Sequence, residues 1–269
     1  MTCSKPGNMR DILDTIIASK HKEVENRKKQ LPFNDLKNHV TKTAGKRSLT
    51  AALQRSTNLQ IIAEFKRKSP SVSNINVTAD AVELSKAFEN AGAAAISVLT
   101  DLPYFGGKMS DLKQVRDAVT MPVLRKDFIV DPYQLWESKA FGADLILLIA
   151  RSLEKSKLQT LLALARDLDM EVLLEVHDVD DIDKIMDLPD FIGVNNRNLQ
   201  TFETSIDRSI SLAPYLPTEV PWVSESGIHQ VQAAHDLHSV GYRLLLMGEH
   251  FMNDPVPGQK CASFINQLS

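Results

Sequence analysis

The chain has few cysteines and no long apolar run, and each shortage excludes a class of protein. Only two cysteines occur among 269 residues, Cys3 and Cys261, so a disulfide framework is not expected. No apolar run reaches the roughly 18 residues that a membrane helix needs. The polar start, residues 1–5, lacks the apolar region of a signal peptide. We therefore expect a cytoplasmic protein that does not contact a membrane.

An excess of charge of one sign is also missing. The 31 Lys and Arg residues are balanced by 34 Asp and Glu residues, which gives a net charge of -3, and the basic residues are scattered. A nucleic-acid surface needs a concentrated basic patch, so no nucleic-acid partner is expected. A small acidic or phosphorylated ligand can still be held by local charges. The 43% hydrophobic and 24% charged content is typical of an ordered globular protein.

The glycine motifs of nucleotide-binding folds are absent as well. The chain contains neither G-x-G-x-x-G nor G-x-x-x-x-G-K-[ST], and the turn after the first apolar run, residues 66–71, has no glycine. An open doubly wound sheet that binds a nucleotide usually carries such a turn. The open sheet is therefore the weaker of the two α/β architectures considered.

Short apolar runs and helical segments alternate through most of the chain. Runs of about six residues begin near Ile61, Ala94, Pro122, Asp144, Glu171, Phe191, Val220 and Arg243. Helical spacing follows them, as in residues 79–91 and 153–168. Eight strands, each with a crossover helix, indicate parallel pairing and are enough to close a barrel. The sequence predicts an α/β fold, a (β/α)8 TIM barrel.

The N-terminal part has a different pattern. Residues 9–29 are predicted to form a helix with an apolar stripe that includes Ile12, Leu13 and Ile16, and a short helix is predicted at residues 49–55. The first helix either docks on the barrel or helps to cover the mouth of a site. We expect a single domain over residues 1–269, with a helical extension at 1–58 and the barrel at 59–269.

Ionisable residues recur where the apolar runs end. A buried charge costs free energy unless it is paired or has a function, and the carboxyl ends of barrel strands meet at one mouth. Counting every second residue points these polar side chains into that mouth: Glu64, Lys66, Lys126, Glu175, Asn195, Arg197 and Glu225. Such coupled acids and bases are typical of proton-transfer chemistry. The alternative is a set of ion pairs that only plugs the barrel.

A metal site is not expected. The seven histidines are dispersed, and only His177 lies beside a strand-end carboxylate. Lys66 and Lys126 would repel a cation from the same cavity.

The last two strands carry a phosphate-type signal. Gly227 and Gly248 each stand at a strand end ahead of a probable helix, where backbone N–H groups bind phosphate. The alternative is that both glycines only form tight turns. Apolar side chains at or beyond strand ends can sandwich a flat ring, although each can equally be core: Phe105, Phe128, Leu147, Leu199 and Leu246. Together these features predict a substrate with a phosphate at one end and an apolar ring at the other.

Several segments, in order along the chain, resemble the indole-3-glycerol phosphate synthase family. They are residues 62–71 (IAEFKRKSPS), 97–101 (SVLTD) with Tyr104 and Phe105, 125–133 (RKDFIVDPY), 142–148 (GADLILL), 175–177 (EVH), 193–199 (GVNNRNL) and 224–227 (SESG). The resemblance implies a barrel with an N-terminal helical extension that acts in tryptophan biosynthesis. The family closes the ring of 1-(2-carboxyphenylamino)-1-deoxyribulose 5-phosphate with loss of carbon dioxide and water. It uses no cofactor and no metal.

The resemblance also implies roles for the residues of the mouth. Lys126 is similar to the family's general acid, Glu175 to the partner base or acid of the dehydration, and Lys66 to a second lysine that contacts substrate anions. Glu64, Asn195 and Glu225 correspond to residues that orient the substrate, with Ser69 nearby and Arg197 as a further binding candidate. The implied phosphate cradle consists of Ser226, Gly227, Gly248 and Glu249. The implied wall around the ring consists of Pro70, Phe105, Phe128, Leu147, Leu199 and Leu246.

The chain departs from the family pattern in the loops. Val72 and Ser73 replace the usual Lys-Gly, and Lys108 stands where a serine is usual, which bears on loop closure and rate. Two other enzyme readings stay open, a Schiff-base aldolase using Lys66 or Lys126 and a phosphoribosylanthranilate isomerase-like barrel. The isomerase family has a cysteine at the first strand end, where this chain has Glu64 and Lys66. The sequence does not settle the oligomeric state, and a monomer is the default expectation.

Overall fold

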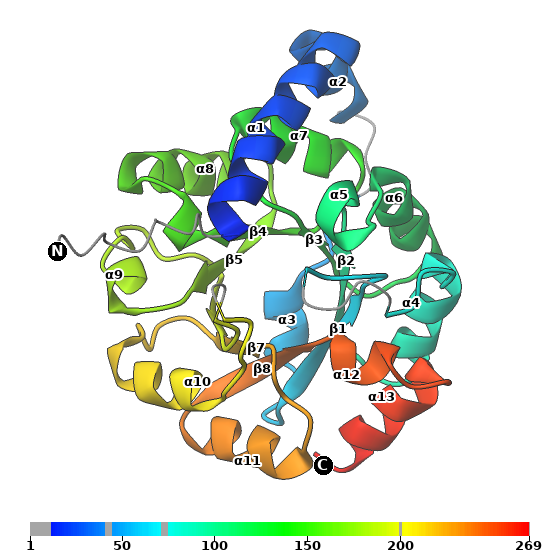
Figure 1. The fold of residues 1–269 in the computed structure, drawn as a ribbon, viewed down its shortest axis with the longest axis vertical. Coiled ribbons are helices and arrows are strands. Elements are labelled where there is room, and N and C mark those ends of the chain that lie inside the picture. The colour runs from blue at the N-terminus through cyan, green and yellow to red at the C-terminus, as the bar shows by residue number, and fades with distance from the viewer. Residues whose placement is uncertain (1–11, 41–44, 71–74, 199–200, 269) are drawn as a thin grey trace, which may run out of the picture.

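A computed structural model describes residues 12–40, 45–70, 75–198 and 201–268, and its centre is a closed barrel of parallel strands (Figure 1). The strands pair in chain order, and β8 returns to β1. Their bounds are β1 Gln60–Phe65, β2 Ala95–Leu99, β3 Val123–Lys126, β4 Leu145–Ile149, β5 Glu171–Val176, β6 Phe191–Asn195, β7 Trp222–Glu225 and β8 Tyr242–Met247. The predicted barrel is confirmed, and each strand begins within two residues of its predicted start.

Helices surround the barrel (Figure 1). The longer ones are α4 Ala81–Asn90, α6 Met109–Ala118, α7 Pro132–Ala140, α8 Lys155–Asp167, α10 Asp207–Leu212, α11 Val231–Ser239 and α13 Pro257–Asn266. Short turns of helix are α5 Leu102–Phe105, η1 Ala150–Ser152, α9 Val179–Ile182, η2 Ala213–Tyr215 and α12 Glu249–Met252. The helix predicted at residues 79–91 begins only at Ala81, because the Asp80 side chain accepts the N–H of Glu83 and caps it.

Alternate residues of each strand belong to two separate apolar clusters. The cluster inside the barrel includes Ile62, Leu124, Leu147, Leu173, Val223 and Leu246. The cluster between the strands and the helices includes Ile61, Val123, Ile146, Leu174 and Ile192. Because successive strand residues point to opposite faces, the inward set extends along β1 from Ile62 to Glu64 and along β3 from Leu124 to Lys126.

A short helix closes the amino-terminal end of the barrel. Leu49 and Leu53, at the two ends of α3 (Leu49–Leu53), are buried in the interior cluster. The carboxylate of Glu171, at the start of β5, accepts the backbone N–H of Leu49 at 2.8 Å and the Ser48 hydroxyl at 2.5 Å. The carboxyl-terminal end of the barrel is therefore the end that is available for a site.

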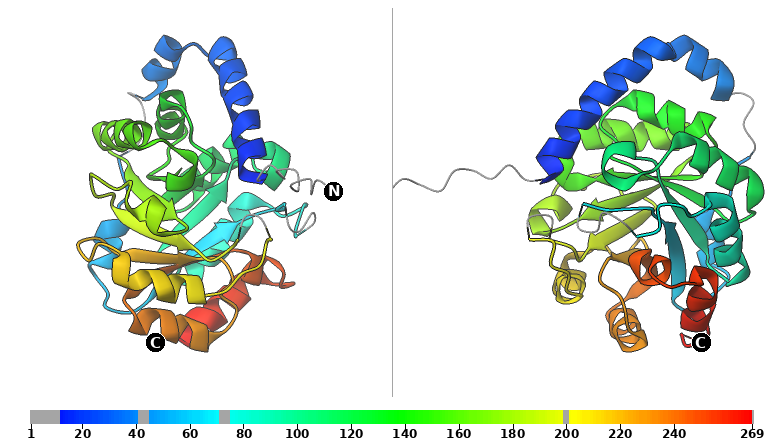
Figure 2. Two further views of the ribbon diagram at one scale, coloured as in Figure 1. Left: turned by 60° about the vertical axis from the view of Figure 1, so that its left-hand side comes forward. Right: turned by 45° about the vertical axis from the view of Figure 1, so that its right-hand side comes forward.

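The N-terminal helices α1 (Ile12–Gln30) and α2 (Phe33–Val40) form a hairpin that rises above the barrel (Figure 2). Val24 and Leu36 pack against Tyr133 of α7. On the buried face of α1, Leu13 and Ile16 precede Lys20, which ion-pairs at the ends of β2 and β3. Residues 9–11 of the predicted first helix lie outside the described residues. Neither α1 nor any other helix in the described ranges is long and apolar enough to span a membrane.

Candidate active site

Three carboxylates from three strands converge on one lysine. Lys126 ends β3, and its Nζ lies 2.5 Å from Glu225 Oε2, 3.6 Å from Glu64 Oε2 and 4.0 Å from Glu175 Oε2. These glutamates belong to β7, β1 and β5, and all three are buried. Closure of the barrel thus brings together four charged groups that are far apart in the sequence.

Lys66 and Asn195 extend this charged cluster. Lys66 follows β1, and its Nζ lies 2.9 Å from Glu64 Oε1. Asn195, the last residue of β6, forms a side-chain hydrogen bond with Glu175. Its Oδ1 also accepts the backbone N–H of Arg197 at 3.0 Å. The six residues with proposed catalytic roles therefore form one connected set.

Burial and charge together displace the pKa values of this cluster. Burial opposes the charged form of Lys126, but attraction to Glu225, Glu64 and Glu175 outweighs it, and the pKa of Lys126 is raised well above its ordinary value. Burial also opposes ionisation of Glu64, but its ion pairs with Lys66 and Lys126 outweigh it and lower the pKa. Lys126 is thus charged at neutral pH.

The two carboxylates on either side of Lys126 are shifted in opposite directions. For Glu175, burial is outweighed by a hydrogen bond from His177 and by attraction to His177 and Lys126, and the pKa falls to about 2. For Glu225, burial dominates over attraction to Lys126, and repulsion from Glu175 and Glu64 adds to it, so the pKa rises to about 7. Neighbouring carboxylates with separated pKa values are typical of acid and base pairs in active sites.

Two glycines, which have no side chain, make room for the carboxylates of Glu225 and Glu64. A Cβ atom at Gly193, on β6, would lie 2.2 Å from Glu225 Oε1, and one at Gly248 would lie 2.8 Å from Glu64 Oε1. Gly248 was predicted as part of a phosphate turn, whereas Gly193 had no predicted role. The only sequence signal for Gly193 is a glycine inside a buried strand.

An apolar pocket opens beside the charged cluster. Its wall contains the predicted residues Ser69, Pro70, Phe105, Phe128, Leu147 and Arg197. The rings of Phe105 and Phe128 lie 5.9 Å apart, tilted by 39°. The pocket is also lined by residues that had no predicted role in substrate binding: Ile12, Leu13 and Ile16 of α1, Leu99, Ile149 and Phe202. The predicted wall residue Leu199 lies outside the described residues.

A second pocket adjoins the first on the side of β7 and β8. It is lined by Ser226, Gly227, Gly248 and Glu249, which were predicted for the phosphate, together with Lys66 and Arg197. Leu246 was predicted for the wall around the ring, but it lines this second pocket instead of the apolar one. Ser226 and Gly227 both have left-handed backbone, with φ of 69° and 73°, which shapes the turn after β7. The Glu249 carboxylate is held 2.9 Å from the Arg197 guanidinium. Its negative charge is therefore neutralised at the edge of the pocket.

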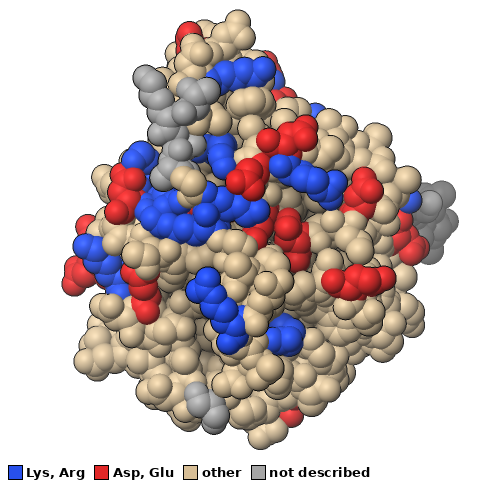
Figure 3. Space-filling view, turned by 180° about the vertical axis from the view of Figure 1, so that it is seen from behind, with Lys and Arg blue, Asp and Glu red and all other residues tan. Residues whose placement is uncertain are grey.

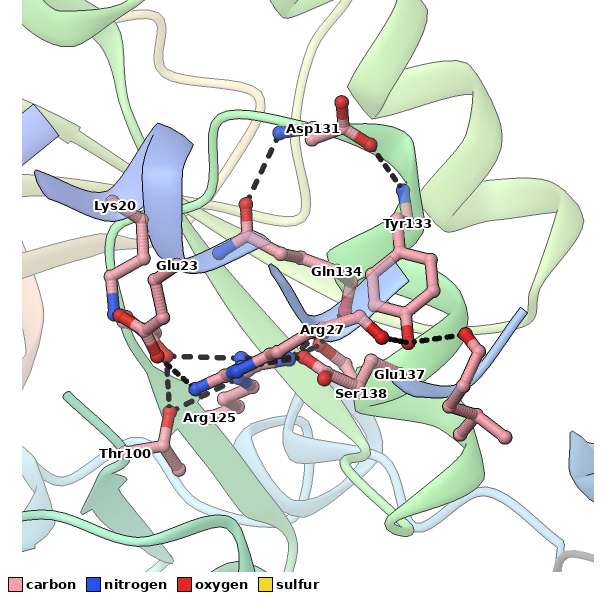
Figure 4. Close-up of polar contacts among 12 residues, drawn as sticks. Lys20, Glu23, Arg27, Thr100, Arg125, Asp131, Tyr133, Gln134, Glu137 and Ser138 are labelled. Atoms are coloured by element: carbon pink, nitrogen blue, oxygen red, sulfur yellow. Dashed lines mark hydrogen bonds and ion pairs between the residues drawn. The ribbon is translucent and has the colours of Figure 1, made fainter. Parts of the chain in front are cut away.

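Behind Lys126, a buried polar network fixes strand β3. Asp127 Oδ2 accepts the Thr100 hydroxyl at 2.6 Å and the Arg125 guanidinium at 3.0 Å. Arg125, which is fully buried, also pairs with Glu137 at 3.1 Å, as Figure 4 shows. Arg125 and Asp127 flank Lys126 in the chain, so this network holds the backbone on both sides of it. In the sequence, the signal for this network was Arg125, a charged residue at an outward-facing position of a buried strand.

No metal centre is evident from the side chains. Within the described residues, no three His, Cys, Asp or Glu side chains are arranged to hold an ion. The ammonium groups of Lys126 and Lys66 are instead paired with the three carboxylates of the cluster.

Comparison with known proteins gives one consistent family. Residues 13–264 match the family model described as indole-3-glycerol phosphate synthase. The chain is 42% identical over 260 residues to the indole-3-glycerol phosphate synthase of Bacteroides thetaiotaomicron, covering 97% of this chain and 100% of that protein. It is 43% identical over 248 residues to the synthase of Neisseria meningitidis serogroup B, covering 91% and 95%. The synthase of Campylobacter fetus is 40% identical over 242 residues, covering 90% and 94%.

Proposed function

The chain belongs to the indole-3-glycerol phosphate synthase family, a carboxy-lyase family of tryptophan biosynthesis, and we propose how its residues divide the reaction. The substrate is 1-(2-carboxyphenylamino)-1-deoxyribulose 5-phosphate. The observation that carries the proposal is the Lys126 ammonium, surrounded by Glu64, Glu175 and Glu225 where the two pockets meet. Lys126 lines both pockets, so groups of the substrate bound in either pocket lie beside the same proton donor.

Each end of the substrate matches one pocket. The carboxyphenyl ring fits the apolar pocket between Phe105, Phe128 and Leu147, and the phosphate fits the turns at Gly227 and Gly248. Lys66 and Arg197 line both pockets and supply positive charge between them. The substrate therefore spans the charged cluster, with its ketone near Lys126.

Ring closure uses Lys126 as general acid. The aromatic carbon that bears the carboxylate attacks the ketone carbon, a carbon–carbon bond forms, and the carbonyl electron pair moves to oxygen. Lys126 gives that oxygen a proton and balances the developing negative charge. Carbon dioxide then leaves, and the electrons of the broken bond restore the aromatic ring. Asn195, Glu64 and Glu225 orient the substrate and hold the lysine.

Dehydration completes the indole. The hydroxyl group formed at the old ketone carbon takes a proton and leaves as water, and the adjacent ring carbon loses a proton as the double bond forms. We assign the base of this step to Glu175, whose low pKa keeps it ionised, and the second acid to Lys66. Two protons are donated and one is accepted, so the cycle takes one proton from solvent.

The decisive experiment is to supply the carboxyphenylamino-deoxyribulose phosphate to the purified chain and to follow indole fluorescence. Folded protein that forms no product contradicts the proposed function. Borohydride added during turnover tests the aldolase alternative, because an imine on Lys66 or Lys126 would be trapped as a stable adduct. Such an adduct contradicts the acid and base assignment.

We also propose that the protein is a cytoplasmic monomer without a nucleic-acid partner, and that its N-terminal extension and barrel form one unit. The scattered basic residues support the absence of nucleic acid, and on the face shown in Figure 3 acidic side chains lie directly beside the basic ones. The buried ion pairs of Lys20 support the single unit. Sedimentation of the purified chain tests the monomer.

A further inference from the structure

His177 contacts the active-site carboxylate that is proposed to act as the base. It is the first residue after β5 and follows Glu175 by two residues, a spacing that puts the two side chains on the same side of the chain. His177 Nε2 lies 2.9 Å from Glu175 Oε1, and only 4% of the histidine and 3% of the glutamate is exposed. None of the steps described above uses this histidine.

The other contacts of Glu175 leave one of its oxygens directed toward the reaction site. Oε2 faces Lys126 Nζ at 4.0 Å, whereas His177 holds Oε1. Asn195, from β6, adds a hydrogen bond, and the Glu225 carboxylate of β7 repels Glu175 across Lys126. The histidine is therefore the candidate for fixing the orientation of this carboxylate among its charged neighbours.

The surroundings of His177 fix its position and its tautomer. Its backbone N–H donates to Asp181 Oδ2 of α9 at 3.0 Å, and Lys184 Nζ lies 3.7 Å from the other oxygen of Asp181. The ring Nδ1 is buried and has no hydrogen-bond partner in the described part of the chain. A proton on Nδ1 would be a buried donor without an acceptor, which is costly. The proton that the ring directs at Glu175 is therefore on Nε2.

We propose that His177 is a positioning residue that donates its Nε2 proton to Glu175, and so keeps this carboxylate ionised and directed at the substrate. The inference rests on the proposed role of Glu175 as the base of the dehydration. Loss of the N–H donor, rather than loss of the imidazole ring, should therefore weaken Glu175 as a base. A side chain of similar reach that also donates an N–H should preserve the basicity of Glu175.

The test compares His177→Leu, which removes the donor, with His177→Gln, which keeps an N–H donor and cannot titrate. The exposed His235 supplies the control, His235→Leu. Carbon-13 NMR of labelled glutamate carboxyls gives the Glu175 pKa directly, with Glu175→Gln identifying the signal. We expect His177→Leu to raise this pKa by about one unit or more, since a hydrogen bond to an ionised group is lost. His177→Gln and the control should stay near the parent value.

The dependence of kcat on pH gives a second readout. In His177→Leu the acid limb should move to higher pH by a similar amount, while the Kd of indole-3-glycerol phosphate stays within about twofold. An unmoved Glu175 pKa in His177→Leu, or an equal shift in His177→Gln, overturns the proposal. The NMR titration needs no turnover, so a parent chain that forms no product counts against the proposed function and leaves the His177 proposal to be judged separately.

Discussion

Lys20 of α1 and Asp127, the residue after β3, form an ion pair of 2.9 Å in which neither side chain is more than 1% exposed. The same Nζ lies 2.9 Å from Asp101, whose side chain caps α5, the helix that carries Phe105. Asp127 follows the proposed general acid Lys126 directly. One lysine of the N-terminal extension therefore connects both to the end of β3, which carries Lys126, and to the apolar wall.

Lys20→Met should destabilise the whole fold. The substitution keeps most of the side-chain volume but leaves Asp101 and Asp127 as buried charges without this partner, at a cost of about 3–5 kcal/mol. Urea unfolding of the parent and the variant measures the difference. Lys22→Met, at an exposed position of the same helix, should change the free energy of unfolding by less than about 0.5 kcal/mol. Equal stability of the two variants would show that Lys20 does not anchor the extension.

Lys126→Ala should abolish most turnover while product binding is largely retained. Loss of a positioned general acid lowers kcat by about 10²–10⁴-fold. The apolar ring pocket and the phosphate turns remain in place, so the Kd of indole-3-glycerol phosphate should change much less than kcat. Fluorescence assays measure both quantities, and Lys86→Ala, at an exposed position on α4, is the control. Retention of most of the rate would exclude Lys126 as the acid.

Glu225 should make stability depend on pH. Its pKa is raised from 4.5 to about 7 in the folded state, so the folded state binds its proton more tightly than the unfolded state does. This contribution is complete below pH 4.5 and is lost as the pH rises toward 7, by an amount on the order of 1 kcal/mol or more. In Glu225→Gln this fall should be absent. Parallel slopes of unfolding free energy against pH between 4.5 and 7 would contradict the raised pKa.

Gly193→Ala should disturb the charged cluster around Lys126. The added methyl group would lie 2.2 Å from Glu225 Oε1, so the carboxylate must leave its ion pair with Lys126 or the strands must move apart. Overpacking of this kind costs about 1–3 kcal/mol, and we expect kcat to fall with it. Gly45→Ala is the matched control, because its methyl group would meet no atom within 4 Å. A fully active Gly193→Ala enzyme would show that Glu225 has more room than the structure gives it.

The sequence by itself determined the barrel, the number of strands and the inward position of the charged strand ends. These follow from local properties, namely the apolar runs, the helical spacing and the two-residue period of strands. The segments around Lys126, Glu175 and Gly227 were also sufficient to identify the family, which the comparisons then confirmed. Local pattern carries this information because each strand presents the same alternation wherever it lies in the barrel.

Only the tertiary structure decided which charged groups are partners. The pairing of Lys20 with Asp127, the order of the carboxylates around Lys126, and the contribution of Leu13 and Ile16 to the apolar pocket join segments that are distant in the chain. Period-two counting assigns a side chain to a face, but it gives neither a distance nor a neighbour. Those depend on barrel closure and on how α1 docks, because burial of a charge and the pKa that results are set by every element around it.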